Sequence, residues 1–293
     1  MSALLVASAV ALIGLPAVVR RLKHQPSPSE RAKLEMTSLV VGIGSLVAAL
    51  CLCSLPVLLD LAGLEPAGLG SRHFFPGGQA AGWLSLVVLG FLLVSGIRAL
   101  VRHLKASRSI VRDLRLGTTA EVAGVRVHVI PVNDPLAIAL PRDGGVIVLS
   151  QGVIDRLDRH QLEVVVRHEQ AHIRHHHHVY LIVADVVDRF FGLAPFVRTS
   201  TNALRLADEQ WADDEAVVST GDRQLISGAM RRIAGLPPGP SIAAFAHADL
   251  VAGRIRHLED DRLPPTLTSR LLLYLVTALG FLGAVGSLIV WAG

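Results

Sequence analysis

Residues 164–172 read Val-Val-Val-Arg-His-Glu-Gln-Ala-His and predict a helix that binds a metal ion. Residues four apart share a helix face, so His168 and His172 can place two imidazole nitrogens about 2.0 to 2.1 Å from one zinc ion. Glu169 would lie beside the ion as a candidate catalytic base. In a chain with 13 histidines the His-Glu-x-x-His spacing alone is moderately specific. Two exposed histidines on a His-rich helix are the alternative interpretation.

A zinc enzyme needs a third protein ligand that leaves one position open for water, and that ligand often comes from another helix. Residues 209–213 read Glu-Gln-Trp-Ala-Asp. In this pattern Glu209 can bind the ion, while Asp213, one turn later, can accept a hydrogen bond from a ligand histidine. Glu209 is therefore the predicted third ligand, with Asp208 and Glu215 as rivals.

Four further histidines, His175 to His178, follow the motif directly. Consecutive residues of a helix point around its whole circumference, so these four side chains cannot converge on a second ion. His175 and His176 would lie nearest the face of His172. Solvated histidines are the favoured interpretation, and the alternative is that one of these two tunes the site or its response to pH.

Hydropathy places the chain in the membrane class, because mean hydropathy is +0.50 and only 18% of the 293 residues are charged. A helix needs about 20 apolar residues to span the hydrocarbon core. Four uncharged stretches qualify: Ala3–Val19, Met36–Leu59, Phe74–Ile97 and Leu271–Gly293. We expect four transmembrane helices, the first being an anchor rather than a signal peptide because it lacks a basic start.

Basic residues predict the orientation, because Lys and Arg resist translocation. The loop after the first stretch carries five of them (Arg20, Arg21, Lys23, Arg31 and Lys33), whereas the loop before the third carries only Arg72. The third stretch exits into a basic run, Arg98 to Arg115, so the polar domain should be cytoplasmic. These positions beside the membrane also explain the pI near 9.6 through anionic lipid, and no nucleic-acid partner is expected.

Three regions follow from this pattern: a membrane domain at 1–101, a cytoplasmic zinc peptidase domain at 102–268, and a last span at 269–293. Within the second, 179–197 is apolar but interrupted by three charged residues, which favours an amphipathic helix against the membrane or the other spans. Strands are predicted at Val125–Ile130, Leu136–Leu140 and Val146–Leu149, with a hairpin turn at Asp143-Gly144-Gly145. Helices are predicted after Gln151, after an N-cap at Asp158, and over Leu204–Val218.

The stretch from Gly145 to Asp158, the motif His-Glu-Gln-Ala-His and Glu209-x-x-x-Asp213 together resemble the BlaR/MecR family of membrane metallopeptidases. The HtpX and CAAX prenyl protease group is similar at a greater distance. The resemblance implies a gluzincin-like core in which His168, His172 and Glu209 bind zinc and Glu169 is the acid/base. BlaR and MecR proteins carry a penicillin-binding sensor domain after the last span, which this sequence lacks, so β-lactam sensing is not expected. HtpX proteins have Asn-Ala-Phe in their substrate-binding strand, where this sequence has Leu-Ala-Ile-Ala-Leu at 136–140.

The sequence thus predicts an α-helical membrane protein with an α+β gluzincin-like domain, three spans before it and one after. Its expected activity is zinc-dependent endoproteolysis, and its expected partners are the lipid bilayer and a protein or peptide substrate, with a repressor or a membrane protein as candidates. The substrate would lie extended along 136–140. Four side chains are candidate donors to the developing oxyanion: Arg174, His175, Asn202 and Arg205. A non-catalytic zinc-containing sensor or scaffold is the alternative function.

Overall fold

A computed structural model describes residues 26–63, 78–114, 117–141, 144–234 and 244–260, together with positions 13, 14, 16, 17, 20 and 278. Two predicted spans, Ala3–Val19 and Leu271–Gly293, lie almost wholly outside these residues. The other two correspond to helices α2 (Pro28–Leu61) and α3 (Gly78–Leu114). By length and composition, Pro28–Leu61 and Gln79–Arg98 could each cross a membrane. Two candidate membrane helices are therefore present in the described part of the chain.

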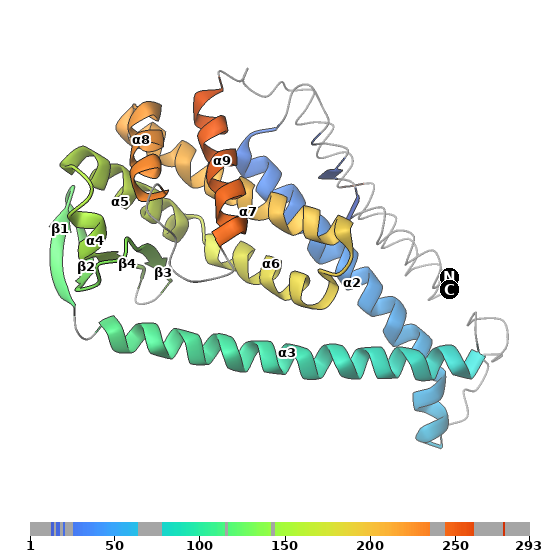
Figure 1. Cartoon of the computed structure of the whole chain (residues 1–293). Helices are drawn as coiled ribbons and strands as arrows, with labels where there is room; N and C mark the ends of the chain where they lie inside the picture. Colours follow the sequence, from blue (N-terminus) through green and yellow to red (C-terminus); the bar gives the residue numbers. More distant parts are fainter. Residues whose placement is uncertain are drawn as a thin grey trace.

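Both apolar helices are longer than the predicted spans. Ser27 caps α2 in a capping box with Glu30, and Pro28 occupies its first turn, so the helix begins before Met36. Helix α3 has 37 residues, about 55 Å at 1.5 Å per residue, and continues past Arg98. Figure 1 shows α3 running along the structure as far as the sheet. A single helix thus connects the apolar stretch with the polar domain.

The sheet has four strands in the order β1-β2-β4-β3. Strands β2 (Val125–Ile130), β3 (Ala137–Leu140) and β4 (Val146–Ser150) confirm the three predicted strands to within one residue at each end. Strand β4 pairs parallel to β2 and antiparallel to β3, which leaves β3 at an edge. Strand β1 (Thr118–Val122) was not predicted; it forms a hairpin with β2 through a turn in which Ala123 and Gly124 have positive φ.

Helix α5 (Arg159–Arg174) carries the motif and follows the short helix α4 (Gln151–Ile154). Asp158 caps α5, because its side chain accepts the backbone N–H of Gln161 while the Gln161 side chain accepts that of Asp158. The predicted N-cap is confirmed. Val166 of α5 is fully buried against the inner face of β2 and β4, which anchors the helix on the sheet.

Helices α6 (His177–Phe191), α7 (Pro195–Thr220), α8 (Arg223–Ala234) and α9 (Ala244–Glu259) complete the described chain. Helix α7 begins nine residues before the predicted start at Leu204, because Pro195 is a favourable first-turn residue. Helices α2, α6 and α7 share one core that includes Leu39, Ala184 and Leu204. The apolar helix α2 is therefore packed into the polar domain (Figure 1).

Basic residues at the start of α2 contact α7, although the sequence places them in a loop. The guanidinium of Arg31 donates to Gln210 Oε1 at 2.6 Å. The ammonium of Lys33 lies 5.1 Å from the centre of the Trp211 ring, within cation–π range. These contacts hold α2 against the part of α7 that carries Glu209.

Candidate active site

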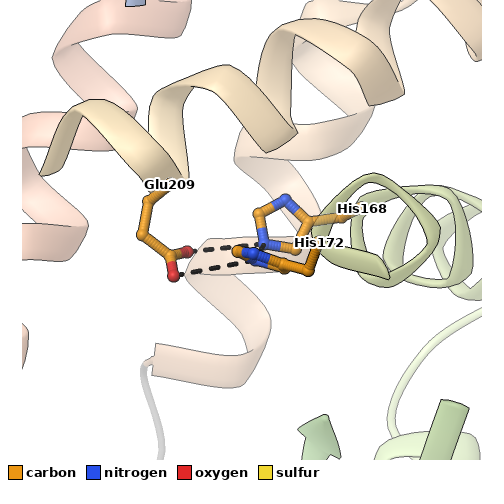
Figure 2. Close-up of side chains that lie close together, drawn as sticks. All are labelled: His168, His172 and Glu209. Carbon is orange, nitrogen blue, oxygen red and sulfur yellow. Dashed lines mark hydrogen bonds and ion pairs between the residues drawn. The ribbon is translucent and has the colours of Figure 1, made fainter. Parts of the chain in front are cut away.

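Helices α5 and α7 bring His168, His172 and Glu209 together, as Figure 2 shows. The two histidine Nε2 atoms are 3.0 Å apart. Glu209 Oε2 lies 3.4 Å from His168 Nε2, and Glu209 Oε1 lies 3.7 Å from His172 Nε2. The three side chains therefore surround one point between the helices.

This donor set fits a metal ion. Two imidazole nitrogens at 3.0 Å, facing a carboxylate, need either a shared proton or a cation between them. Two histidines and one carboxylate are the ligands of many catalytic zinc sites. Neither rival ligand takes the place of Glu209 here, because Asp208 faces His177 and Glu215 faces Arg174 and His175.

Asp213 and Arg254 support this cluster from behind. Asp213 is fully buried, and its Oδ1 lies 3.0 Å from His168 Nδ1. Arg254 of α9 makes two hydrogen bonds to Asp213, at 2.7 and 2.9 Å, and contacts Glu209 Oε2 at 2.8 Å. A buried cation thus joins the two acidic side chains of α7. Sequence reasoning missed Arg254, which lies 41 residues after Asp213 with no motif to mark it.

The pKa values reflect a cluster that holds a proton when no metal is bound. Burial and Arg254 disfavour a charged His168, but hydrogen bonds to Asp213 and Glu209 outweigh them and raise its pKa to about 9. Burial, followed by the charge of His168, lowers the pKa of His172 to about 4. Burial opposes the charge of Glu209, yet Arg254 and His168 hold its pKa well below its usual range. Without a metal, these surroundings therefore favour a positive charge on His168 beside Glu209 and Asp213.

Glu169 lies on the side of α5 that faces the edge strand β3. Burial raises the pKa of Glu169 to about 7, and a hydrogen bond from the backbone N–H of Ala139 acts in the opposite direction. Leu136 exchanges hydrogen bonds with Ser150, so Leu136 faces β4. Because antiparallel pairing alternates, Ala137 and Ala139 direct their backbone groups to the open edge. This edge therefore runs beside Glu169.

The four candidate oxyanion donors bind other side chains. Arg174 and His175 contact Glu215, at 3.2 and 3.3 Å. Arg205 pairs with Asp188 at 2.7 Å and with Asp185 at 2.8 Å, and its other contact is with Asn202. Arg254, which was not among the candidates, is the guanidinium that lies at the cluster in the described part of the chain.

The histidine run departs from its prediction. Helix α5 ends at Arg174, His176 adopts a left-handed conformation with φ 54°, and α6 begins at His177. His177 is completely buried, and its Nδ1 lies 2.8 Å from His172 Nδ1. The prediction of a continuous helix with solvated histidines is wrong at this residue, because the break turns His177 back toward the motif.

Comparisons with known proteins give the following likenesses. The family model described as BlaR1 peptidase M56 matches residues 79–229, just over half of the chain. A protein named Protease HtpX homolog, from Salinibacter ruber (strain DSM 13855 / M31), is 31% identical over 116 residues. That alignment covers 33% of this chain and 42% of the relative's length. No solved structure matches.

Proposed function

This chain belongs to the BlaR1 peptidase M56 family, and from that membership we propose that it is a membrane-embedded zinc endopeptidase. Family membership makes it a peptidase. The likeness to an HtpX homolog and the two apolar helices support a membrane-associated metallopeptidase. The convergence of His168, His172 and Glu209 beside the buried Glu169 is the observation that carries the proposal.

We assign His168, His172 and Glu209 as the zinc ligands. Glu169, Glu209 and Asp213 contribute three negative charges when ionised, and Arg254 contributes one positive charge, so the surroundings of the two neutral histidines favour a divalent cation. Asp213 accepts the Nδ1–H of His168 and so turns the His168 Nε2 lone pair toward the ion. Arg254 holds Asp213 in this role through its two hydrogen bonds.

A bound zinc ion supplies a Lewis acid that polarises the scissile carbonyl and makes water more acidic. A carboxylate oxygen of Glu169 takes a proton from the attacking water and then gives it to the leaving amine. Before a metal binds, burial raises the pKa of Glu169 to about 7, which favours a carboxyl group that can return its proton to the leaving amine.

The substrate adds to the open edge of β3 as an extended strand. The outward N–H and carbonyl of Ala137 and the outward carbonyl of Ala139 would pair with its main chain, which places a scissile bond beside Glu169. Main-chain pairing binds a peptide without demanding one side-chain sequence. This arrangement suits a protease of broad sequence tolerance whose selectivity comes from access to the substrate.

We further propose that the chain is a multi-pass protein of the cell membrane and that its peptidase domain lies in the cytoplasm. The core shared by α2, α6 and α7 supports a site close to the bilayer. Val179, Ile182 and Val186 of α6 are exposed, which supports contact of α6 with lipid. A cytoplasmic or membrane-adjacent protein, such as a repressor or a membrane protein, would then be the substrate, in regulatory proteolysis or quality control.

A substrate trap tests the activity. Glu169→Gln should keep zinc at one ion per chain and lose hydrolysis, because the ligands remain and only the proton carrier is removed. Glu163→Gln is the matched control, since Glu163 lies on α5 but is only half-buried and pairs with Arg167. Proteins that accumulate uncleaved with Glu169→Gln, and are cleaved with wild type and the control, are the substrates. Cleavage by Glu169→Gln at the wild-type rate would refute the mechanism, and zinc binding without hydrolysis in wild type would favour the sensor or scaffold.

A further inference from the structure

The break between α5 and α6 brings a second buried imidazole to the metal-facing histidine His172. In an unbroken helix, residue 177 would lie five positions after His172, about 140° away around the axis, and could not touch it. The left-handed conformation of His176 ends α5 and reverses this direction. For a residue other than glycine that conformation is strained, because the Cβ atom approaches the backbone carbonyl oxygen. The strained residue, His176, is therefore the one whose conformation places His177 against His172.

The His177 ring is held firmly in this position. It is completely buried, and the Trp211 ring centre lies 4.8 Å from its own, with Tyr180 at 6.1 Å and His175 at 5.7 Å. The 2.8 Å separation of the Nδ1 atoms of His172 and His177 is a hydrogen-bond distance. One of the two nitrogens must therefore carry the hydrogen that they share.

The direction of this hydrogen bond follows from the ligand role of His172. A neutral imidazole carries one hydrogen, and a nitrogen that binds a metal must be the one without it. The Nε2 atom of His172 faces His168 and Glu209, so the hydrogen belongs on Nδ1. The acceptor for that Nδ1–H is then His177 Nδ1.

We propose that His177 is a positioning residue that fixes the tautomer and ring orientation of His172, as Asp213 does for His168. The inference rests on the proposed zinc site. Each ligand histidine then has its own buried acceptor on the side away from the ion, one from α7 and one from the start of α6. Loss of a partner of this kind typically lowers metal affinity by about 10- to 100-fold.

A second metal site that includes Asp208 is the alternative to this positioning role, and the test must distinguish the two. Asp208 Oδ1 lies 3.4 Å from His177 Nδ1, and both carboxyl oxygens are buried without a hydrogen-bond partner among the described residues. His172, His177 and Asp208 could hold a second cation by proximity alone. That would require His172 to bind metal through both nitrogens and to lose its ring hydrogen, which the hydrogen bond to His177 avoids.

Metal binding to the full-length protein in detergent tests the proposal, with Co²⁺ and Zn²⁺ as probes, a chelating dye as competitor and mass spectrometry for the stoichiometry. His177→Phe keeps an aromatic ring but removes the acceptor, and it should weaken binding by about 10- to 100-fold. His177→Asn offers an amide oxygen close to the position of Nδ1 and should restore affinity to within about threefold, since an oxygen acceptor also satisfies the Nδ1–H of His172. His178→Ala is the matched control, because His178 is the next residue of α6 and lies outside the cluster.

The following outcomes decide whether His177 positions His172. A loss in His177→Phe with recovery in His177→Asn, at one ion per chain, supports the proposal. Wild-type affinity in His177→Phe, or equal losses in the Phe and Asn variants, overturns it. A stoichiometry of two ions per wild-type chain, with one ion lost in Asp208→Asn, also overturns the proposal. This measurement does not depend on the folding of any His177 variant. A wild-type protein that binds neither metal refutes the proposed function itself, which separates the two failures.

Discussion

Replacement of Arg254 by methionine tests whether the guanidinium and a metal ion share the task of neutralising the site. Methionine keeps most of the apolar stem of the side chain but removes the guanidinium and its charge. The change eliminates two hydrogen bonds to Asp213 and the contact with Glu209. In the metal-free protein, the buried Asp213 and the largely buried Glu209 would then lose the guanidinium that contacts both of them.

The size of the effect follows from the burial of these groups. Removal of one partner from a buried ion pair typically destabilises a protein by about 3 to 5 kcal/mol. At roughly 2 to 4 °C per kcal/mol for a large domain, this corresponds to a decrease in Tm of about 6 to 20 °C. With zinc present, the ion supplies positive charge at Glu209, so the decrease should be clearly smaller.

Thermal unfolding of the full-length protein in detergent, with EDTA and with Zn²⁺, measures both quantities. Arg256→Met is the matched control, because Arg256 lies on α9 but is exposed and, among the described residues, donates to the backbone carbonyl of Ala252. Its Tm should change by less than about 2 °C in either condition, as for an ordinary surface substitution. An equal decrease in Tm for Arg254→Met with EDTA and with Zn²⁺ would refute the shared role of Arg254 and the ion.

Three further predictions follow from the same contacts. Asp213→Asn should weaken Zn²⁺ binding by about 10- to 100-fold, measured by chelator competition, because the acceptor behind His168 loses its charge; unchanged affinity would contradict this. His176→Gly should raise the free energy of unfolding by up to about 1 kcal/mol in chemical denaturation, because glycine adopts a left-handed conformation without strain, whereas His176→Val should lower it. Ala137→Pro should raise KM for a peptide substrate and leave Zn²⁺ stoichiometry at the wild-type value, because proline removes an N–H at the open edge of β3; an unchanged KM would exclude β3 as the substrate strand.

Local patterns explain which parts of the fold the sequence predicted. Asp158 followed by Gln161 marks the start of α5, and alternating apolar residues mark β2. Strand β1 escaped prediction because Thr118–Val122 is half-exposed and its turn uses Ala123 at positive φ, a position where turn rules expect glycine or asparagine. The three predicted strands have apolar runs and clear turn residues between them.

The site shows the same division between local and long-range information. Spacings of four residues on one helix lead directly to His168 with His172 and to Glu209 with Asp213. Arg254 and His177 depend on tertiary structure: one on the packing of α9 against α7, the other on a helix break inside a run of four identical residues. A run of identical histidines carries no information about which one is buried. Helical periodicity therefore placed His175 and His176 nearest to His172, whereas His177 makes the contact.

The contacts of α2 indicate that the apolar helices do more than anchor the peptidase domain. Arg31 of α2 donates to Gln210 Oε1, and the amide nitrogen of Gln210 donates to the carbonyl of Gly253. Gln210 and Gly253 directly adjoin Glu209 and Arg254 in the sequence, so one glutamine side chain connects α2, the helix of the proposed ligand and the helix of its guanidinium partner. Because Gln210 is buried, loss of the contact from α2 would leave a polar group without its partner in the wall of the site. The position of α2 and the arrangement of His168, His172 and Glu209 are therefore determined together.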